Sequence, residues 1–213
     1  MSILDAHTHS VKPKSVVSVG YGDSLKLDEI DYFSVGVHPW IFTQSIDLKD
    51  VLTFIENISF ERKLVAIGET GLDKLFPQFE NQKLIFNLQI NLSIEMDLPV
   101  IIHSVKSQNE ILKILKSKNL KNSILFHGFN GSKQEAFEIL NNGHYIGVGP
   151  QLLKNMRVNT YLSEIPLDRI LIETDDTNTQ VDKILHLMSL KLEKPKDFLK
   201  DHLNKNFFNF FNL

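Results

Sequence analysis

The stretch DAHTH, residues 5–9, ends the first run of strand-forming residues, which extends from Ile3 to His7. In an extended segment, side chains two positions apart point to the same side, so the imidazoles of His7 and His9 can converge on one metal ion. An isolated His-x-His pair is a weak signal and is more often an incidental surface pair. The rest of the chain therefore decides whether this pair belongs to a metal site.

The composition is that of a folded globular protein, with 42% hydrophobic and 23% charged residues, and we expect a single domain over residues 1–213. Because the chain has no cysteine, disulfides and thiolate ligands are excluded, and any metal must bind to histidines and carboxylates. The net charge of −3 argues against a broad basic surface for nucleic acid. With no apolar leader or membrane-length segment, we expect a cytoplasmic protein that needs neither a membrane nor an obligate protein partner.

Short strand-forming runs alternate with longer amphipathic ones along the chain. Apolar positions spaced three and four apart predict helices over residues 82–94 and 110–116. Strands separated by helices indicate parallel pairing. Ser107-x-x-Glu110 and Ser132-x-x-Glu135 predict capping boxes at the start of two helices. The eight expected strands are residues 3–7, 15–19, 34–37, 64–68, 99–102, 123–126, 144–148 and 170–174.

Eight such steps predict a (β/α)₈ barrel of the TIM type, trimmed because the usual barrel has nearer ~250 residues. The first connection, residues 8–14, is too short for a helix, so we expect a degenerate first step. A doubly wound open sheet is the alternative, supported by a weak helix signal near residues 25–31.

Histidines gather where the expected strands end, and an even scatter over the chain would place only about one there. Glu69 and Asp175 close the apolar strands 64–68 and 170–174, where a carboxylate is costly to desolvate unless it is paired or bound to metal. In a barrel, catalytic side chains lie at these carboxyl ends. We therefore expect His144, His186 and His202 to be structural or exposed. The five histidines at strand ends are His7, His9, His38, His103 and His127.

Taken in order, these strand-end motifs resemble those of the TatD family of metal-dependent deoxyribonucleases. The motifs are DAHTH at 5–9, GVHP at 36–39, GETGLD at 68–73, PVIIH at 99–103, HGFNG at 127–131 and ETD at 173–175. The resemblance implies a (β/α)₈ barrel that hydrolyses phosphodiesters, with DNA or an oligonucleotide as substrate. It also implies two divalent ions, bound by His7, His9, Glu69, His103, His127 and Asp175.

Two divalent ions would carry four positive charges, of which Glu69 and Asp175 would neutralise two, so such a site would attract phosphate in an acidic protein. Glu69 is the natural bridge because one carboxylate has two oxygens, and Asp175 is the candidate general base. His38 is a candidate for substrate binding, although a structural role fits it equally. His and carboxylate ligands suit Zn²⁺, Mn²⁺, Co²⁺ and, less well, Mg²⁺.

Two departures from the family pattern affect the substrate side. The family has an arginine at the position of Val105, and it has a proline at the position of Asp176. The neighbouring Lys106 is a second candidate for substrate binding, although on a regular strand its side chain would point away. Two alternatives therefore stay open: a related two-metal hydrolase of another substrate (a phosphate monoester, an ester or an amide), and a metal-binding partner protein without turnover.

Overall fold

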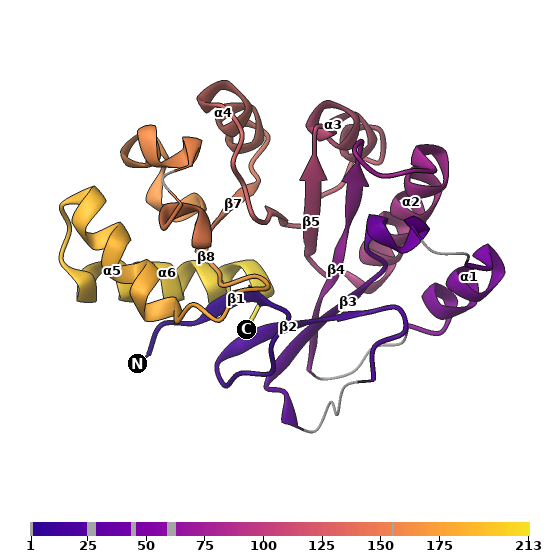
Figure 1. The fold of residues 1–213 in the computed structure, drawn as a ribbon, viewed down its shortest axis with the longest axis horizontal. Coiled ribbons are helices and arrows are strands. Elements are labelled where there is room, and N and C mark those ends of the chain that lie inside the picture. The colour runs from indigo at the N-terminus through magenta and orange to yellow at the C-terminus, as the bar shows by residue number, and fades with distance from the viewer. Residues whose placement is uncertain (1, 25–28, 44–45, 59–62, 155) are drawn as a thin grey trace.

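In the computed structural model, eight parallel strands form one sheet in chain order (Figure 1). The structure describes residues 2–24, 29–43, 46–58, 63–154 and 156–213. All eight predicted strands are present, with β4 five residues longer than expected. The strands are β1 (Asp5–Thr8), β2 (Ser15–Gly20), β3 (Tyr32–Gly36), β4 (Leu64–Asp73), β5 (Val100–Val105), β6 (Ile124–Phe126), β7 (Tyr145–Val148) and β8 (Ile170–Ile172).

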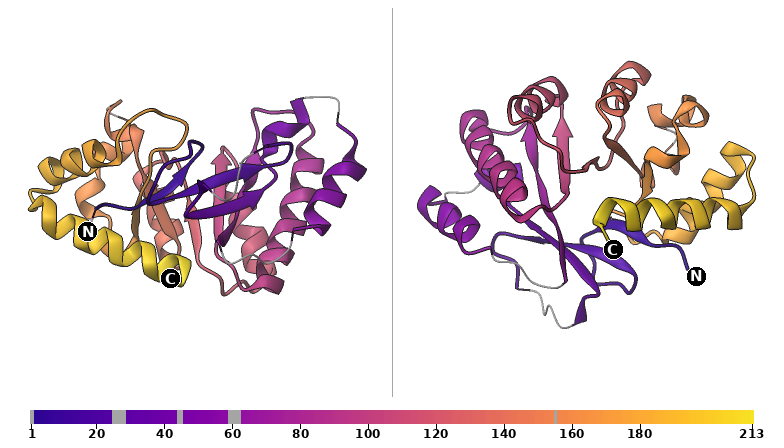
Figure 2. Two further views of the ribbon diagram at one scale, coloured as in Figure 1. Left: turned by 90° about the horizontal axis from the view of Figure 1, so that it is seen from below. Right: turned by 180° about the vertical axis from the view of Figure 1, so that it is seen from behind.

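The sheet curls round until its first and last strands meet, so the fold is a nearly closed barrel (Figure 2). The amide of Asp175 donates to the carbonyl of His7 over 3.0 Å, and the amide of His9 donates to the carbonyl of Asp175 over 3.1 Å. These bonds also hold the two predicted metal-binding segments side by side. The barrel prediction is confirmed, and the open-sheet alternative is wrong.

Helices cover the outside of the barrel, and the first βα step lacks a helix, as predicted. Residues 9–14, between β1 and β2, contain no helix, and the described residues between β7 and β8 form short 3₁₀ turns and no α-helix, which was not predicted. The helix signal near 25–31 falls partly on residues 25–28, outside the described residues, and 29–31 form no α-helix. The α-helices are α1 (Leu48–Glu56), α2 (Phe79–Met96), α3 (Gln108–Ser117), α4 (Lys133–Asn141), α5 (Val181–Leu192) and α6 (Lys196–Phe211).

One predicted capping box is confirmed and the other is wrong. At the start of α4, Ser132 and Glu135 exchange the two expected bonds. At the start of α3, the Ser107 hydroxyl instead donates to the carbonyl of Leu72 on β4, over 2.5 Å. Ser107 is buried, so the tertiary partner replaces the local cap and ties α3 to the sheet.

Alternation along the strands separates the barrel interior from the helix-packed outside. Ile101, Leu125 and Leu171 belong to the interior cluster, whereas their neighbours such as Ile102 pack under the helices. Three phenylalanines of α6 join the interior cluster and close the barrel at its amino end: Phe207, Phe210 and Phe211. The carboxyl end is left for polar side chains. None of the helices in the described ranges is long and apolar enough to span a membrane.

Candidate metal centre

The strand alternation carries three predicted ligands into the mouth of the barrel. His103 lies two residues beyond Ile101, His127 two beyond Leu125, and Asp175 four beyond Leu171. Side chains spaced by even steps share a face, so these three continue the interior layer upward. Apolar residues fill the lower part of the barrel, and ionisable residues fill its top.

Glu69 reaches the same mouth because β4 is irregular at that point. Ile67 pairs with Val100 and Thr70 pairs with Ile102. Between these two pairs, β4 therefore contains one residue more than β5 does. Such a bulge turns the extra side chain out of the regular alternation. Gly68 has φ +139°, and a Cβ there would lie 2.5 Å from the Ile101 carbonyl oxygen, so this close approach needs glycine.

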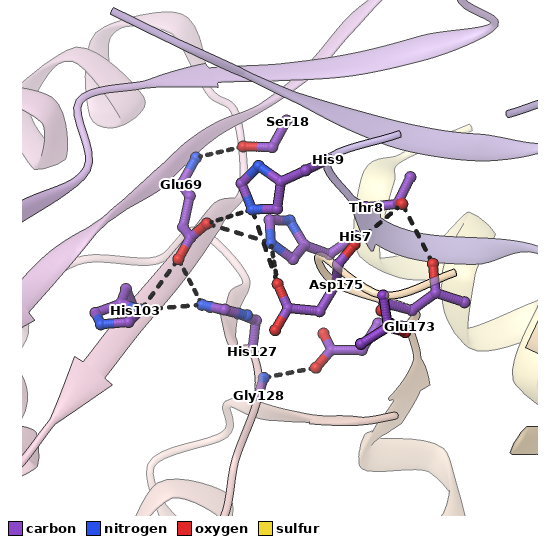
Figure 3. A network of polar contacts seen from close by, with 12 residues as sticks. His7, Thr8, His9, Ser18, Glu69, His103, His127, Gly128, Glu173 and Asp175 are labelled. Carbon is purple, nitrogen blue, oxygen red and sulfur yellow. Dashed lines mark hydrogen bonds and ion pairs between the residues drawn. The ribbon is translucent and has the colours of Figure 1, made fainter. Parts of the chain in front are cut away.

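The carboxylate of Glu69 is buried at the centre of a ring of imidazoles (Figure 3). His7, His9, His103 and His127 surround it as predicted, and His38 joins them. On Oε2, the distances are 3.3 Å to His7 Nε2 and 3.0 Å to His9 Nε2; on Oε1, they are 3.0 Å to His38 Nε2, 3.1 Å to His103 Nδ1 and 2.7 Å to His127 Nε2.

Asp175 lies on the Oε2 side of this ring. Its Oδ1 atom is 3.8 Å from Nε2 of His7 and 3.8 Å from Nε2 of His9. Unlike Glu69, the Asp175 side chain is partly open to solvent. The structure thus brings all six predicted ligands together, with one carboxylate at the centre and the other at the entrance.

The charges of the cluster are strongly coupled. Burial would raise the pKa of Glu69, but His127 and His103 outweigh it and hold that pKa well below its usual range. Burial likewise disfavours the charged form of His127, yet Glu69 raises the pKa of His127 to about 10. Burial lowers the pKa of His7. Without a metal, positive charge in this cluster would therefore be held by protons on imidazoles around an ionised Glu69.

The hydrogen bonds of the cluster fit a divalent cation. His7 is fully buried, and neither of its ring nitrogens forms a hydrogen bond. His103 Nδ1 and His127 Nε2 face each other at 3.4 Å, although both also face Glu69 Oε1. Buried nitrogens without donors or acceptors are costly in a folded protein, whereas a metal ion takes up such lone pairs. Ligand atoms within 4.8 Å of one another form three groups: His7, His9 and Glu69; His7, His127 and Asp175; and His38, Glu69 and His103.

His38 differs from the other imidazoles in its hydrogen bonds. Its Nδ1 atom accepts the backbone N–H of Trp40 over 3.2 Å. In the neutral ring this leaves the proton on Nε2, the atom 3.0 Å from Glu69 Oε1. Such a nitrogen donates and has no free lone pair for a metal. We therefore keep His38 outside the proposed ligand set, although its ring lies within ligand distance of Glu69 and His103.

Two neighbouring residues were not predicted as part of the site. Asp73, at the end of β4, is buried, and its Oδ2 atom lies 3.4 Å from His103 Nε2 and accepts the indole N–H of Trp40 over 2.8 Å. A carboxylate behind a histidine fixes the orientation of the ring. The acid at the end of the GETGLD motif was the available signal, but its partners lie more than 25 residues away in sequence.

Glu173 is another buried residue that was quoted in a motif but given no role. Its Oε1 atom accepts the amide of Gly128 over 2.5 Å, while Oε2 has no hydrogen-bond partner. Burial raises the pKa of Glu173 to about 8. A Cβ at Gly147 would lie 2.4 Å from Oε2, so the glycine leaves space for this carboxyl group. Gly147 in β7 was the signal in the sequence.

Lys106, the second predicted substrate residue, lies outside the ring of imidazoles. Its φ of +52° ends the regular path of β5, and its side chain is exposed. It lines a cavity of about 330 Å³ together with Arg157 and His127. The pocket directly over the cluster holds about 290 Å³ and also contains His127, so the two cavities adjoin at that residue.

A sequence profile of the family described as TatD related DNase matches residues 22–212. The chain belongs to the TatD family. The crystal structure of YjjV, a TatD homologue from Escherichia coli, superposes with a TM-score of 0.84 and 26% identity, covering 99% of this chain and 98% of that one. This match confirms the fold, and a TatD family hydrolase from Entamoeba histolytica (TM-score 0.76, 23% identity) shares it over 92% of this chain and 84% of its own.

Three proteins that are named as metal-dependent hydrolases or as a deoxyribonuclease are similar to this chain in sequence. The uncharacterized metal-dependent hydrolases YjjV of Escherichia coli and YabD of Bacillus subtilis are 34% and 36% identical over 68% and 70% of this chain. Human deoxyribonuclease TATDN3 is 30% identical over 62% of it. The chain spans 57%, 60% and 50% of the lengths of these three relatives.

Proposed function

We propose that this TatD family protein is a metal-dependent phosphodiesterase that hydrolyses DNA or short oligonucleotides with two divalent ions. The observation that carries the proposal is the ring of five imidazoles around the buried carboxylate of Glu69, with Asp175 at its open side. The names of its relatives support it, since some are metal-dependent hydrolases and others deoxyribonucleases. The predicted single domain and cytoplasmic location stay predictions.

The two oxygens of Glu69 face different sets of ligands, which is why we assign it the bridging role. His7, His9 and Asp175 lie on the Oε2 side and would hold one ion with that oxygen. His103 and His127 lie on the Oε1 side and would hold the other. When bound, the ions would polarise a phosphate and make a water molecule acidic enough to act as nucleophile near neutral pH.

Proton transfer and the orientation of the ligands are assigned to side chains of the protein. Asp175 is open to solvent at the pocket entrance, so it can accept the proton of the attacking water. His38 lines the pocket and faces Glu69 Oε1 through Nε2 over 3.0 Å, so we assign it the positioning of that carboxylate. Asp73 keeps the His103 ring oriented through Nε2. Glu69 holds the cluster together and takes no part in proton transfer.

Positive side chains lie on one flank of the pocket, where they can bind the adjoining phosphates of a strand. Lys106 and Arg157 line the cavity that meets the metal pocket at His127. With only these two cations in that described lining, a short strand end fits the site better than a long duplex tract. We therefore expect faster cleavage of short single strands than of closed circular duplex.

The test compares four substrates on the metal-loaded protein: a single-stranded oligonucleotide, bis(p-nitrophenyl) phosphate, p-nitrophenyl phosphate and p-nitrophenyl acetate. We expect hydrolysis of both phosphodiesters, abolished by a chelator and restored by divalent metal. Turnover of the monoester or the carboxylic ester alone would instead favour the related two-metal hydrolase. Metal binding without turnover of any substrate would favour the partner-protein alternative.

A further inference from the structure

Trp40 is an exposed tryptophan beside a polar metal pocket. It follows the GVHP motif in the 3₁₀ turn after β3 and is 48% exposed. It lines the 290 Å³ pocket over the cluster, and it also lines a larger cavity of about 650 Å³ whose described lining does not include Lys106. Trp40 therefore lies between the pocket over the cluster and a larger cavity that shares His9, His38 and Glu69 with that pocket.

The Trp40 indole ring is held in place by a hydrogen bond and a stacking contact, although it is exposed to solvent. Its N–H donates to buried Asp73 over 2.8 Å, and the same oxygen lies 3.4 Å from His103. Phe76 stacks on it with ring centroids 4.9 Å apart and planes 21° apart. The hydrogen bond fixes the ring without hiding it, which is the arrangement of a prepared contact surface.

The larger cavity takes its imidazoles, His9 and His38, from the metal cluster, and the rest of its described lining offers surface for a flat neutral ring. Among the described residues that line it there is no lysine or arginine, whereas Asp23 and Glu69 are acidic. Tyr21 and Ile46 add ring and apolar surface to Trp40. Its volume of about 650 Å³ is ample for a nucleobase and its sugar.

We propose that the Trp40–Phe76 pair is a stacking platform for the nucleobase attached to the phosphodiester that is cleaved at the metal centre. The phosphate would lie over the cluster, the base would extend toward Trp40, and the next phosphate would lie toward Lys106 and Arg157. Stacking tolerates every base because each has a π face, so the platform would give affinity without sequence specificity. The inference rests on the proposed function, because it assigns a subsite to that same reaction.

The binding test uses the fact that Trp40 is the only tryptophan of the chain, so intrinsic fluorescence reports on this ring alone. The metal-loaded protein is titrated with thymidine 5′-monophosphate and with deoxyribose 5-phosphate, which lacks the base. We expect the nucleotide alone to quench the fluorescence and to bind roughly 5- to 100-fold more tightly. Equal affinities, or no quenching by the nucleotide, would overturn the platform.

Substitutions test whether the aromatic rings of Trp40 and Phe76 cause the preference for the nucleotide over the sugar phosphate. By calorimetry, Trp40→Leu should remove the preference for the nucleotide, and Trp40→Phe should keep most of it. Phe76→Leu, read by the remaining fluorescence, should weaken nucleotide binding only. Leu75→Ala is the control, since Leu75 is 63% exposed nearby but lines neither cavity, and it should change nothing. A Trp40→Leu protein that still prefers the nucleotide would contradict the proposal.

A kinetic pair separates this inference from the proposed function. Thymidine 5′-(p-nitrophenyl phosphate) and methyl p-nitrophenyl phosphate carry the same leaving group, but only the first has a base. Trp40→Leu should lower kcat/KM for the first by roughly 5- to 100-fold more than for the second, so the ratio of the two reports on the base alone and cancels any effect through Asp73 on the metal centre. If wild-type protein cleaves both at equal rates, the platform fails while the phosphodiesterase stands. If it cleaves neither but still binds the nucleotide through Trp40, the function fails and the platform stands.

Discussion

The two ends of the barrel satisfy their buried polar groups in opposite ways. At the amino end, α6 closes the barrel with phenylalanines, and its buried Asn204 and Asn206 side chains form hydrogen bonds with backbone groups. Asn204 accepts the amide of Leu4 over 2.9 Å, and Asn206 donates to the carbonyls of Leu167 and Ile170 over 2.7 and 2.8 Å. At the carboxyl end, buried nitrogens and oxygens lack such partners.

The difference is concentrated in a few side chains. Among the described residues, six buried side-chain atoms form no hydrogen bond, and four of them belong to His7, His127 and Glu173 at the carboxyl end. A fold tolerates such groups where something outside the chain satisfies them. The comparison therefore identifies the amino end with stability and the carboxyl end with ligand binding, which can be tested end by end.

The largest effect is expected at the carboxyl end, from Asp175→Asn. The amide keeps one oxygen near His7 and His9 but cannot accept the proton of the attacking water. We expect a fall in single-turnover rate of ~10²–10⁴ at saturating metal, with most of the metal retained. Asp176→Asn is the matched control, because Asp176 lines the same pocket but belongs to none of the three ligand groups. Near-normal turnover in Asp175→Asn with both ions bound would leave Asp175 as a ligand only.

The matching change at the amino end is Phe210→Ala. Phe210 is fully buried against Tyr145 and Phe211, so its loss should lower the free energy of unfolding by ~3–5 kcal/mol. Metal content and rate per folded molecule should not change. Phe198→Ala on the same helix removes a side chain that is 50% exposed and should cost far less. Urea unfolding measures both variants, and loss of metal from folded Phe210→Ala would break the separation of the two ends.

A smaller effect concerns His144, at the amino-end start of β7. Burial and the nearby Arg169 charge lower the pKa of His144 to about 4, from a usual value of 6.5. Between these two values the unfolded chain binds a proton that the folded chain does not. Stability is therefore lost as the pH falls from 6.5 toward 4, by at most ~2 kcal/mol at pH 5.

His144→Leu should remove that part of the pH dependence. Urea unfolding of wild type and variant at pH 7.5 and pH 5 gives the measurement, with the pH 7.5 value as internal reference. The wild type should lose more stability between the two pH values than the variant does. An equal loss in both would mean that His144 takes up its proton in the folded state without penalty.

The sequence was sufficient for the eight strands and for the gathering of six ligands, because apolar runs and strand-end positions are local signals. It failed where a distant partner decides the outcome. Ser107 has the pattern of a cap but bonds to Leu72. Asp73 ends the GETGLD motif, but its role and that of Trp40 come from contacts made across the barrel mouth. The bulge that aims Glu69 inward depends on the register of β4 against β5.

The central claim is that Glu69 is shared between two divalent ions, and metal content tests it most directly. Elemental analysis of wild-type protein, Glu69→Gln and Glu173→Gln should be made on folded samples after dialysis against limiting divalent metal. Glu173→Gln is the matched control, since Glu173 is a buried carboxyl beside the cluster whose Oε1 contact to Gly128 survives as an amide. We predict close to two ions per chain in wild type and Glu173→Gln, and fewer than one in Glu69→Gln. One ion in the wild type, or two retained by Glu69→Gln, would contradict the account.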